Sequence, residues 1–257
     1  MNGVQMRKLW LEYGDNVVLE RVDLEVAEGA FCAIVGPSGA GKTSLLRLLL
    51  GSERPTRGEL LFRGKALPPE PDPTRGIVYQ RYSVYPHLDV RQNLMLALEF
   101  AGDPLFGRLW GARRRQAVAR VDAMLDQVGL TAAAGRYPDQ LSGGMQQRLA
   151  LAQALIREPR LLLLDEPFGA LDPGIRRDMH VLVRELWQRT GLTVFMVTHD
   201  LSEAFALANR VLVLDRPRLD PHEPGRFGAT ITYDIPVSPR DVAAIPISAG
   251  NKWRKSA

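Results

Sequence analysis

The 257-residue chain has a single cysteine and no long uninterrupted run of apolar residues. Because Cys32 has no second cysteine to pair with, a disulfide within the chain is excluded, and a reducing cytoplasm fits. A membrane-spanning helix needs about 18 consecutive apolar residues, and no stretch approaches that length. Met1–Trp10 carries two cations with no apolar segment behind them, so we expect no secretory signal.

A strong charge imbalance is also absent. The 33 Lys and Arg residues nearly balance the 29 Asp and Glu residues, which leaves a net charge of +4. The excess is scattered, so we expect a solvated surface and no nucleic-acid partner. With 46% hydrophobic and 24% charged residues, the composition is typical of a soluble globular chain. We find no internal repeat, and the length allows one generous domain or one domain with an inserted subdomain.

Short apolar runs separated by helical segments predict parallel strands that are covered on both faces. These runs are Phe31–Val35, Leu161–Leu164, Thr193–Thr198 and Val211–Leu214. Before residue 31 the apolar residues alternate with polar ones, which predicts an antiparallel β edge. Between about 90 and 157 the spacing is helical, with one helix ending near Gly129 and another running from Met145 to about Glu158, before Pro159.

The segment Gly36–Thr43 reads Gly-Pro-Ser-Gly-Ala-Gly-Lys-Thr and matches the phosphate-loop pattern G-x-x-x-x-G-K-[ST]. Its glycines let the backbone N–H groups approach phosphate oxygens, and the helix that follows adds its positive end. We expect Lys42 to neutralise the β- and γ-phosphates of ATP and the Thr43 hydroxyl to bind Mg²⁺. The predicted phosphate-loop residues are Gly36, Pro37, Ser38, Gly39, Ala40, Gly41, Lys42, Thr43 and Ser44.

Polar residues at other strand ends predict the catalytic groups, because chemistry in such sheets lies at the carboxyl ends of the strands. Asp165 is placed to hold Mg²⁺, and Glu166 to polarise a water molecule for in-line attack. His199 is expected to contact the γ-phosphate, and Gln80 to contact the metal and the attacking water. On local grounds alone, a lone histidine is more often structural, and Gln80 reads as a surface residue.

Two further positions are open to a local and a functional interpretation. Tyr13 is either a half-buried edge-strand tyrosine or an aromatic surface on which adenine stacks. Ser142, Gly143 and Gly144 stand before a helix, where a serine is a common cap and exposed N–H groups bind anions. A cap alone does not require two consecutive glycines, so the sequence suggests a close approach at this helix start.

In order and spacing, these segments resemble the ATP-binding subunits of ABC transporters over roughly residues 4 to 216. Gly36–Thr43 resembles the Walker A loop, Leu161–Glu166 the Walker B strand, and Leu141–Gln146 the signature segment. Gln80, His199 and Tyr13 resemble the Q-loop, switch histidine and A-loop, and Gly169–Asp172 resembles the D-loop. The resemblance implies that Asp172 and the Ser142–Gly144 segment join the nucleotide-binding residues.

The resemblance also implies a head-to-tail pair of ATP-binding subunits, which we expect to be a homodimer. Each of two ATP molecules would lie between the Walker motifs of one subunit and the Ser142–Gly144 segment of the other. Glu166 would be the general base, oriented with help from His199. Closure and opening of the pair would move membrane permease subunits, with a periplasmic solute-binding protein as an indirect partner.

Within the family, Leu141–Arg148 and Asp165–Pro173 look like importers of the nitrate/sulfonate/taurine group, at the cytoplasmic face of the inner membrane. Phe227–Asp234 resembles a branch associated with urea-carboxylase genes, which suggests a small nitrogenous solute. An exporter ATPase subunit and a soluble ABC ATPase without a transport role are the alternatives. The segment 101–116, with Phe106, Trp110 and three arginines at 113–115, is interpreted either as a solvated helix start or as a contact with the permease or the membrane.

The predicted fold class is therefore α/β. It combines a P-loop NTPase parallel-sheet core, an antiparallel β edge subdomain and an inserted helical subdomain. We assign residues 1–89 and 158–216 to the core with its β edge, 90–157 to the helical subdomain, and 217–257 to a short C-terminal extension. Within that extension we expect one more strand at Ala229–Ile235 and fraying at 251–257.

Overall fold

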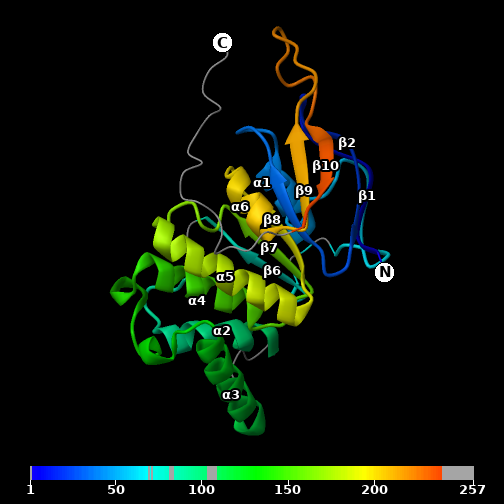
Figure 1. Cartoon of the computed structure of the whole chain (residues 1–257). Coiled ribbons are helices and arrows are strands. Elements are labelled where there is room, and N and C mark those ends of the chain that lie inside the picture. Colours follow the sequence, from blue (N-terminus) through cyan, green and yellow to red (C-terminus); the bar gives the residue numbers. More distant parts are fainter. Residues whose placement is uncertain (1, 69, 71, 81–83, 103–108, 239–257) are drawn as a thin grey trace.

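A six-stranded sheet, parallel except at one edge, forms the centre of the molecule (Figure 1). The computed structural model describes residues 2–68, 70, 72–80, 84–102 and 109–238. In spatial order the strands are β10 (Thr230–Pro236), β9 (Arg210–Asp215), β3 (Phe31–Val35), β8 (Thr193–Val197), β7 (Leu161–Asp165) and β6 (Arg75–Val78). The predicted parallel core is confirmed.

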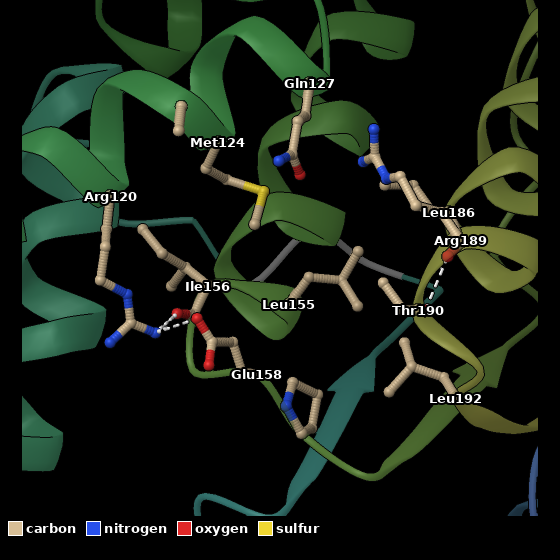
Figure 2. A pocket seen from close by; sticks show the side chains of 12 residues that line it. Arg120, Met124, Gln127, Leu155, Ile156, Glu158, Leu186, Arg189, Thr190 and Leu192 are labelled. Atoms are coloured by element: carbon tan, nitrogen blue, oxygen red, sulfur yellow. Dashed lines mark hydrogen bonds and ion pairs between the residues drawn. The ribbon is translucent and has the colours of Figure 1, made fainter.

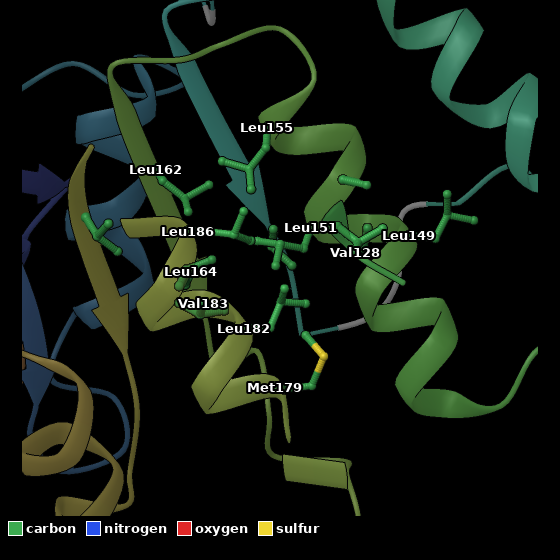
Figure 3. Close-up of a cluster of buried hydrophobic side chains, with 14 of the residues drawn as sticks. Val128, Leu149, Leu151, Leu155, Leu162, Leu164, Met179, Leu182, Val183 and Leu186 are labelled. Atoms are coloured by element: carbon green, nitrogen blue, oxygen red, sulfur yellow. The ribbon is translucent and has the colours of Figure 1, made fainter. Parts of the chain in front are cut away.

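The apolar runs of this sheet are continuous because both of its faces are buried. Successive side chains of a strand point to opposite faces. Phe31 and Ala33 therefore pack into the cluster on one face, while Cys32 and Ile34 pack into the cluster on the other. On the first face, Leu162 and Leu164 of β7 meet leucines of the helices that cover it (Figure 3).

A second, antiparallel sheet of four strands packs beside the first, as the alternating pattern predicts. Its order is β2 (Asn16–Ala27), β1 (Asn2–Tyr13), β4 (Arg57–Phe62) and β5 (Lys65–Ala66). β2 has apolar residues at Val17–Leu19 and again within Val22–Val26. Both stretches belong to this one strand, which has a bulge where Arg21 takes a φ of 45°. The inner face of β2 and β1 shares its apolar cluster with helix α1.

The helices lie on both faces of the central sheet. They are α1 (Lys42–Leu50), α2 (Val90–Gly102), α3 (Gly111–Gln127), α4 (Gly143–Leu155), α5 (Pro173–Thr190) and α6 (Leu201–Leu207), with short 3₁₀ turns at Thr131–Ala133 and Pro138–Gln140. α1 contacts β6, β7 and β8, whereas α4 contacts β6, α2 and α5. Figure 1 places α2, α3 and α4 on the side of the sheet away from β1 and β2. Within the described ranges, no helix combines the length and apolar composition that crossing a membrane requires.

The helix predicted from Met145 to about Glu158 starts and ends earlier than expected. α4 begins at Gly143 and ends at Leu155. A proline disfavours helical geometry at the residue before it, and Glu158, which precedes Pro159, has a φ of 54°. The proline therefore marks the end of a turn that follows the helix, and the pattern placed both ends of the helix too late in the sequence. α3, by contrast, ends at Gln127, close to the predicted boundary near Gly129.

The C-terminal extension joins the two sheets. β10 pairs antiparallel with β9, and the segment just before it bonds to β2, through Val17 N–H to the Gly225 carbonyl at 2.8 Å and Ala229 N–H to the Val18 carbonyl at 2.9 Å. Arg210 of β9 donates two hydrogen bonds to the Asp234 carboxylate of β10, at 2.7 and 2.6 Å. The strand expected within 229–235 is confirmed, and residues 239–257 lie outside the described ranges.

Part of the segment singled out at 101–116 is described. Residues 103–108, with Phe106, lie outside the described ranges. Trp110 is 72% exposed and precedes α3, and Arg113, Arg114 and Arg115 are exposed in the first turns of that helix. The arginines thus lie on a helix start, and the proposed contact with a permease or membrane stays a prediction.

We expect Cys32 to react with a thiol reagent such as DTNB only when the protein unfolds. Its side chain is 0% exposed, and burial raises the pKa of the thiol to about 12, so the reactive thiolate is nearly absent at mildly alkaline pH. Absorbance of the released chromophore, with and without guanidinium chloride, measures this. Because the folded pKa exceeds the unfolded value of 9.0, this group also lowers folding stability as the pH rises from about 9 to 12. Rapid labelling of the native protein would contradict the buried placement.

Candidate nucleotide-binding site

The phosphate loop connects β3 to α1, and its glycines are required by a close contact at Gly36 and by backbone conformation at Gly39 and Gly41. A Cβ atom on Gly36 would lie 2.0 Å from the carbonyl oxygen of Leu214, so no larger residue fits there without moving β9. Gly39 and Gly41 have φ values of 78° and 84°, in the left-handed region that favours glycine. Pro37, Ser38 and Gly39 are exposed and Ala40 is buried, so the loop is anchored on one side and open on the other.

Lys42 begins α1 and lies inside the loop. Its side-chain ammonium donates to the carbonyl oxygens of Gly36 and Pro37, each at 2.8 Å, and the residue is only 8% exposed. Burial lowers the pKa of Lys42, while the negative charges of Glu166 and Asp165 act in the opposite direction. The loop therefore holds a positive charge next to two carboxylates, which suits a phosphate chain with a bound cation.

Thr43 and Asp165 come together from α1 and the end of β7. The Thr43 hydroxyl donates to Asp165 Oδ1 at 3.4 Å. Burial raises the pKa of Asp165, which the Thr43 hydrogen bond partly offsets. No cluster of three or more His, Cys, Asp or Glu suited to a metal occurs in the described ranges. A hydroxyl and one carboxylate fit Mg²⁺, which takes few protein oxygens and completes its shell with water and phosphate.

Glu166 lies at the meeting point of three strand ends. Its carboxylate Oε2 is 3.4 Å from His199 Nδ1, after β8, and 3.5 Å from Gln80 Nε2, after β6. Its backbone N–H donates to the Val197 carbonyl at 3.0 Å, and its φ is 46°, which a non-glycine residue rarely adopts. Strain of this kind concentrates at functional sites, where the surrounding structure enforces it. The fold thus brings Gln80, Glu166 and His199 together, as the sequence led us to expect.

Tyr13 is the last residue of β1 and lies beside the start of α1. Its hydroxyl donates to Glu53 Oε2 at 2.6 Å and interacts with the Ser44 side chain, and the residue is 48% exposed. Burial and the Glu53 carboxylate raise the pKa of Tyr13. The aromatic ring is therefore fixed next to the phosphate loop with part of its surface open. Glu53 is a partner that the sequence did not single out, because nothing in its local pattern distinguishes it.

The Ser142–Gly144 segment begins α4, and its three residues differ in exposure. Ser142 Oγ accepts from the Met145 N–H at 3.4 Å, so the serine caps the helix. Ser142 and Gly143 are exposed, whereas Gly144 is buried, and a Cβ atom on it would lie 2.4 Å from Ile175 Cγ2 of α5. The second glycine thus has a packing reason within the chain. Only Ser142 and Gly143 are open to an outside group.

Asp172 stands at the N-terminus of α5, close in sequence to Glu166. Its backbone carbonyl accepts from the Arg176 N–H at 2.8 Å, while its exposed carboxylate makes no capping hydrogen bond. The structure leaves its side chain available to another group.

A cavity of about 460 Å³ lies elsewhere, at the amino edge of the central sheet (Figure 2). It opens between α3, α4 and α5, where Pro159 and Leu192 precede β7 and β8. Its lining is mainly apolar, with Arg120 and Glu158 paired at 3.1 Å on one side. None of the predicted site residues lines it, so we assign the nucleotide site to the carboxyl edge and not to this cavity.

The fold and this edge define a P-loop nucleotide-binding protein of the ATP-binding-cassette class. A family model described as ABC transporter matches residues 19–169. The chain superposes on the dimeric ATP-binding cassette MJ0796, in a post-hydrolysis state bound to ADP and Pi, with a TM-score of 0.71, 28% identity, and coverage of 91% of this chain and 99% of the other. The chain belongs to the ABC transporter family.

Curated relatives share more sequence with the chain. It is 41% identical to the sulfate/thiosulfate import ATP-binding protein CysA of Xanthomonas campestris pv. campestris, over 92% of this chain and 67% of the relative. The CysA of Mycolicibacterium paratuberculosis is 39% identical, over 91% and 62%. The spermidine/putrescine import ATP-binding protein PotA of Roseobacter denitrificans is 40% identical, over 85% and 58%. The chain thus spans 58% to 67% of the length of these relatives.

Proposed function

We propose that this chain binds and hydrolyses ATP as the nucleotide-binding subunit of an ABC importer. The observation that carries the proposal is the convergence of Gln80, Glu166 and His199 on one point beside the loop that holds Lys42. A P-loop protein that only bound nucleotide would not require a strained glutamate there, with two polar side chains on its carboxylate.

The site's own groups divide the chemistry among them. Lys42 places positive charge on the β- and γ-phosphates. Thr43 and Asp165 would hold Mg²⁺, which when bound neutralises charge on the phosphate oxygens. Glu166 takes the proton of the attacking water, because a carboxylate at a strand end can reach a water in line with the γ-phosphate. His199 and Gln80 orient Glu166, and Tyr13 offers a surface for adenine.

We further propose that catalysis requires two subunits. Ser142 and Gly143 form an exposed helix start with free donors, although Gly36–Thr43 already provides the chain's own phosphate cradle. This second anion-binding group is therefore assigned to the ATP of a second copy, with Asp172 as a further contact at the same junction. The dimeric state of the cassette that the chain superposes on supports this reading.

The proposed partners are membrane permease subunits at the cytoplasmic face of the inner membrane. A periplasmic solute-binding protein would deliver a small polar solute. The names of the relatives support import: sulfate and thiosulfate for one protein, spermidine and putrescine for another. The solutes in these two names have opposite charge although the chain is 41% and 40% identical to the two relatives, which agrees with selectivity that resides in other subunits. The assignment to the nitrate/sulfonate/taurine group and to the urea-carboxylase branch stays a proposal from the sequence. So does the division of the chain into a helical subdomain at 90–157 and a C-terminal extension at 217–257.

A substitution that adds negative charge at Ser142 tests the two-subunit site. Aspartate caps a helix as well as serine does, so Ser142→Asp is expected to leave the fold and ATP binding by the isolated subunit unchanged. Its negative charge would face the phosphates of the second subunit's ATP, and ATP turnover is expected to fall at least about tenfold. Ligand titration and phosphate release measure the two quantities.

Ser142→Asn is the matched control, because asparagine caps equally well without charge. It is expected to keep most of the turnover. If Ser142→Asp retained full turnover, or if it lost ATP binding as an isolated subunit, the two-subunit assignment would be wrong.

A further inference from the structure

An ionisable pair is buried behind the candidate catalytic groups. His180 of α5 and Glu203 of α6 lie 2.9 Å apart, Nε2 to Oε1, with side chains only 9% and 6% exposed. Burying such groups is costly unless they bond to each other, and apolar residues of similar volume are often at least as stabilising. The pair is therefore not explained by folding stability alone. The sequence offers one signal for it: a histidine on the apolar face of α5, between Met179 and Leu182.

The first link runs from this pair to the segment of Glu166. The His180 ring packs edge-on against Phe168, with ring centroids 4.9 Å apart. Phe168 is 1% exposed, and it follows Glu166 by two residues. Around it, the Gly169 N–H donates to the Glu166 carbonyl at 3.3 Å and the Leu171 N–H donates to the Phe168 carbonyl at 3.1 Å. The backbone after Glu166 therefore forms a tight turn, and this turn contacts the His180 ring through Phe168.

The second link runs to the segment of His199. Glu203 lies in the first turn of α6, which starts directly after His199 and Asp200. Asp200 Oδ1 accepts from the Ser202 and Glu203 N–H groups at 2.8 and 3.3 Å. The bond from Glu203 to His180 therefore fixes the start of α6 on α5, and with it the position of His199.

A charged contact one turn earlier on α5 supports the same connection. Arg176 donates to the Leu171 carbonyl at 3.1 Å and lies 3.8 Å from the Asp200 carboxylate. Arg176 and His180 are four residues apart and thus share one helix face. That face contacts both the segment after Glu166 and the segment after His199.

We propose that His180 and Glu203 are positioning residues that hold Glu166 and His199 in register for ATP hydrolysis, an inference that rests on the proposed function. The contacts of the Glu166 carboxylate to His199 and Gln80 are long, at 3.4 and 3.5 Å, so they do not fix its position by themselves. The relative position of Glu166 and His199 is set by the backbone segments that carry them, and the His180–Glu203 pair connects those two segments. Small displacements of reacting groups reduce turnover strongly without changing how substrate binds.

The test removes the pair without leaving a buried charge. Single removal of His180 would strand the Glu203 carboxylate and endanger folding, whereas the double variant His180→Leu/Glu203→Met replaces both polar groups with apolar ones of similar size. We expect its kcat to fall about tenfold while KM for ATP changes less than about twofold. His180→Gln keeps a donor for Glu203 and is expected to stay within about threefold of the parent protein.

The control is Trp187→Phe, at the far end of the same helix. It removes the hydrogen bond from Trp187 Nε1 to the Gly29 carbonyl, of 2.9 Å, and is expected to leave kcat unchanged. A folded double variant with parental kcat, or one in which KM rises while kcat is kept, would overturn the proposal.

A second readout separates this inference from the proposed function. The chain has four histidines, so the imidazole NMR signal of His199 can be assigned by single substitutions. It is expected to shift in the double variant and to stay in place in Trp187→Phe, whether or not the protein hydrolyses ATP. An unchanged His199 signal would refute the positioning role. Lack of turnover in the parent protein would refute the hydrolytic function instead.

Discussion

Glu166→Gln is expected to lower ATP turnover about 1000-fold while ATP still binds, as the loss of a general base does. Glutamine has the same shape as glutamate, so it fits the space beside Gln80 and His199 but cannot accept the proton of the attacking water. It also leaves Thr43, Asp165 and Lys42 intact. We therefore expect ATP to accumulate in a stable complex of two subunits, detectable by size-exclusion chromatography with ATP.

The matched control for this variant is Glu185→Gln, which makes the same chemical change at an exposed position of α5. It is expected to behave like the parent protein. Phosphate release under saturating ATP measures the turnover of both. Full turnover in Glu166→Gln would rule out Glu166 as the base and leave the in-line water to another group.

Lys42→Ala is expected to weaken ATP binding about 100-fold, which corresponds to roughly 3 kcal/mol. The ammonium is the positive charge at the centre of the loop, and in a partly buried site it acts on phosphate more strongly than a surface lysine does. The variant also removes the donor that satisfies the carbonyls of Gly36 and Pro37, so the loop is expected to lose order. Titration calorimetry with ATP measures the affinity.

Lys65→Ala serves as the control, since Lys65 is exposed on β5 and lies outside the candidate site. Its affinity for ATP is expected to match that of the parent protein, and thermal melts of both variants report whether they are folded. Unchanged affinity in Lys42→Ala would mean that the backbone of the loop, and not its lysine, provides the binding energy.

Much of the central sheet was predictable from local sequence. Runs such as Phe31–Val35 and Leu161–Leu164 are buried on both faces, and that burial removes every polar residue from them, which is the pattern that identifies such strands. The catalytic groups were predictable for a related reason. Parallel strands end at one edge, so residues that follow β6, β7 and β8 meet there although they are far apart in the chain.

What the sequence did not predict depends on tertiary contacts. The need for glycine at position 144 comes from Ile175 on another helix, and the partner of Tyr13 is Glu53, which lies 40 residues later in the chain. A strand near 230–236 was expected, but its neighbours were not. Backbone hydrogen bonds to β9 and β2 do not change the pattern of apolar and polar residues, so the sequence does not show them. The contact between His180 and Glu203 could not be predicted either, because nothing in the sequence around one residue indicates that the other is its partner.

The placement of β10 also has a consequence for the order in which the protein folds. β10 is the last strand to be synthesised among the residues the structure describes, yet it covers the outer edge of β9, whose inner edge pairs with the strand leading into the phosphate loop. A nascent chain that has completed all three catalytic strand ends still carries an open sheet edge, which can pair with another chain. The edge of β9 is therefore covered only after translation has passed residue 236, and β10 then forms the edge of the finished sheet.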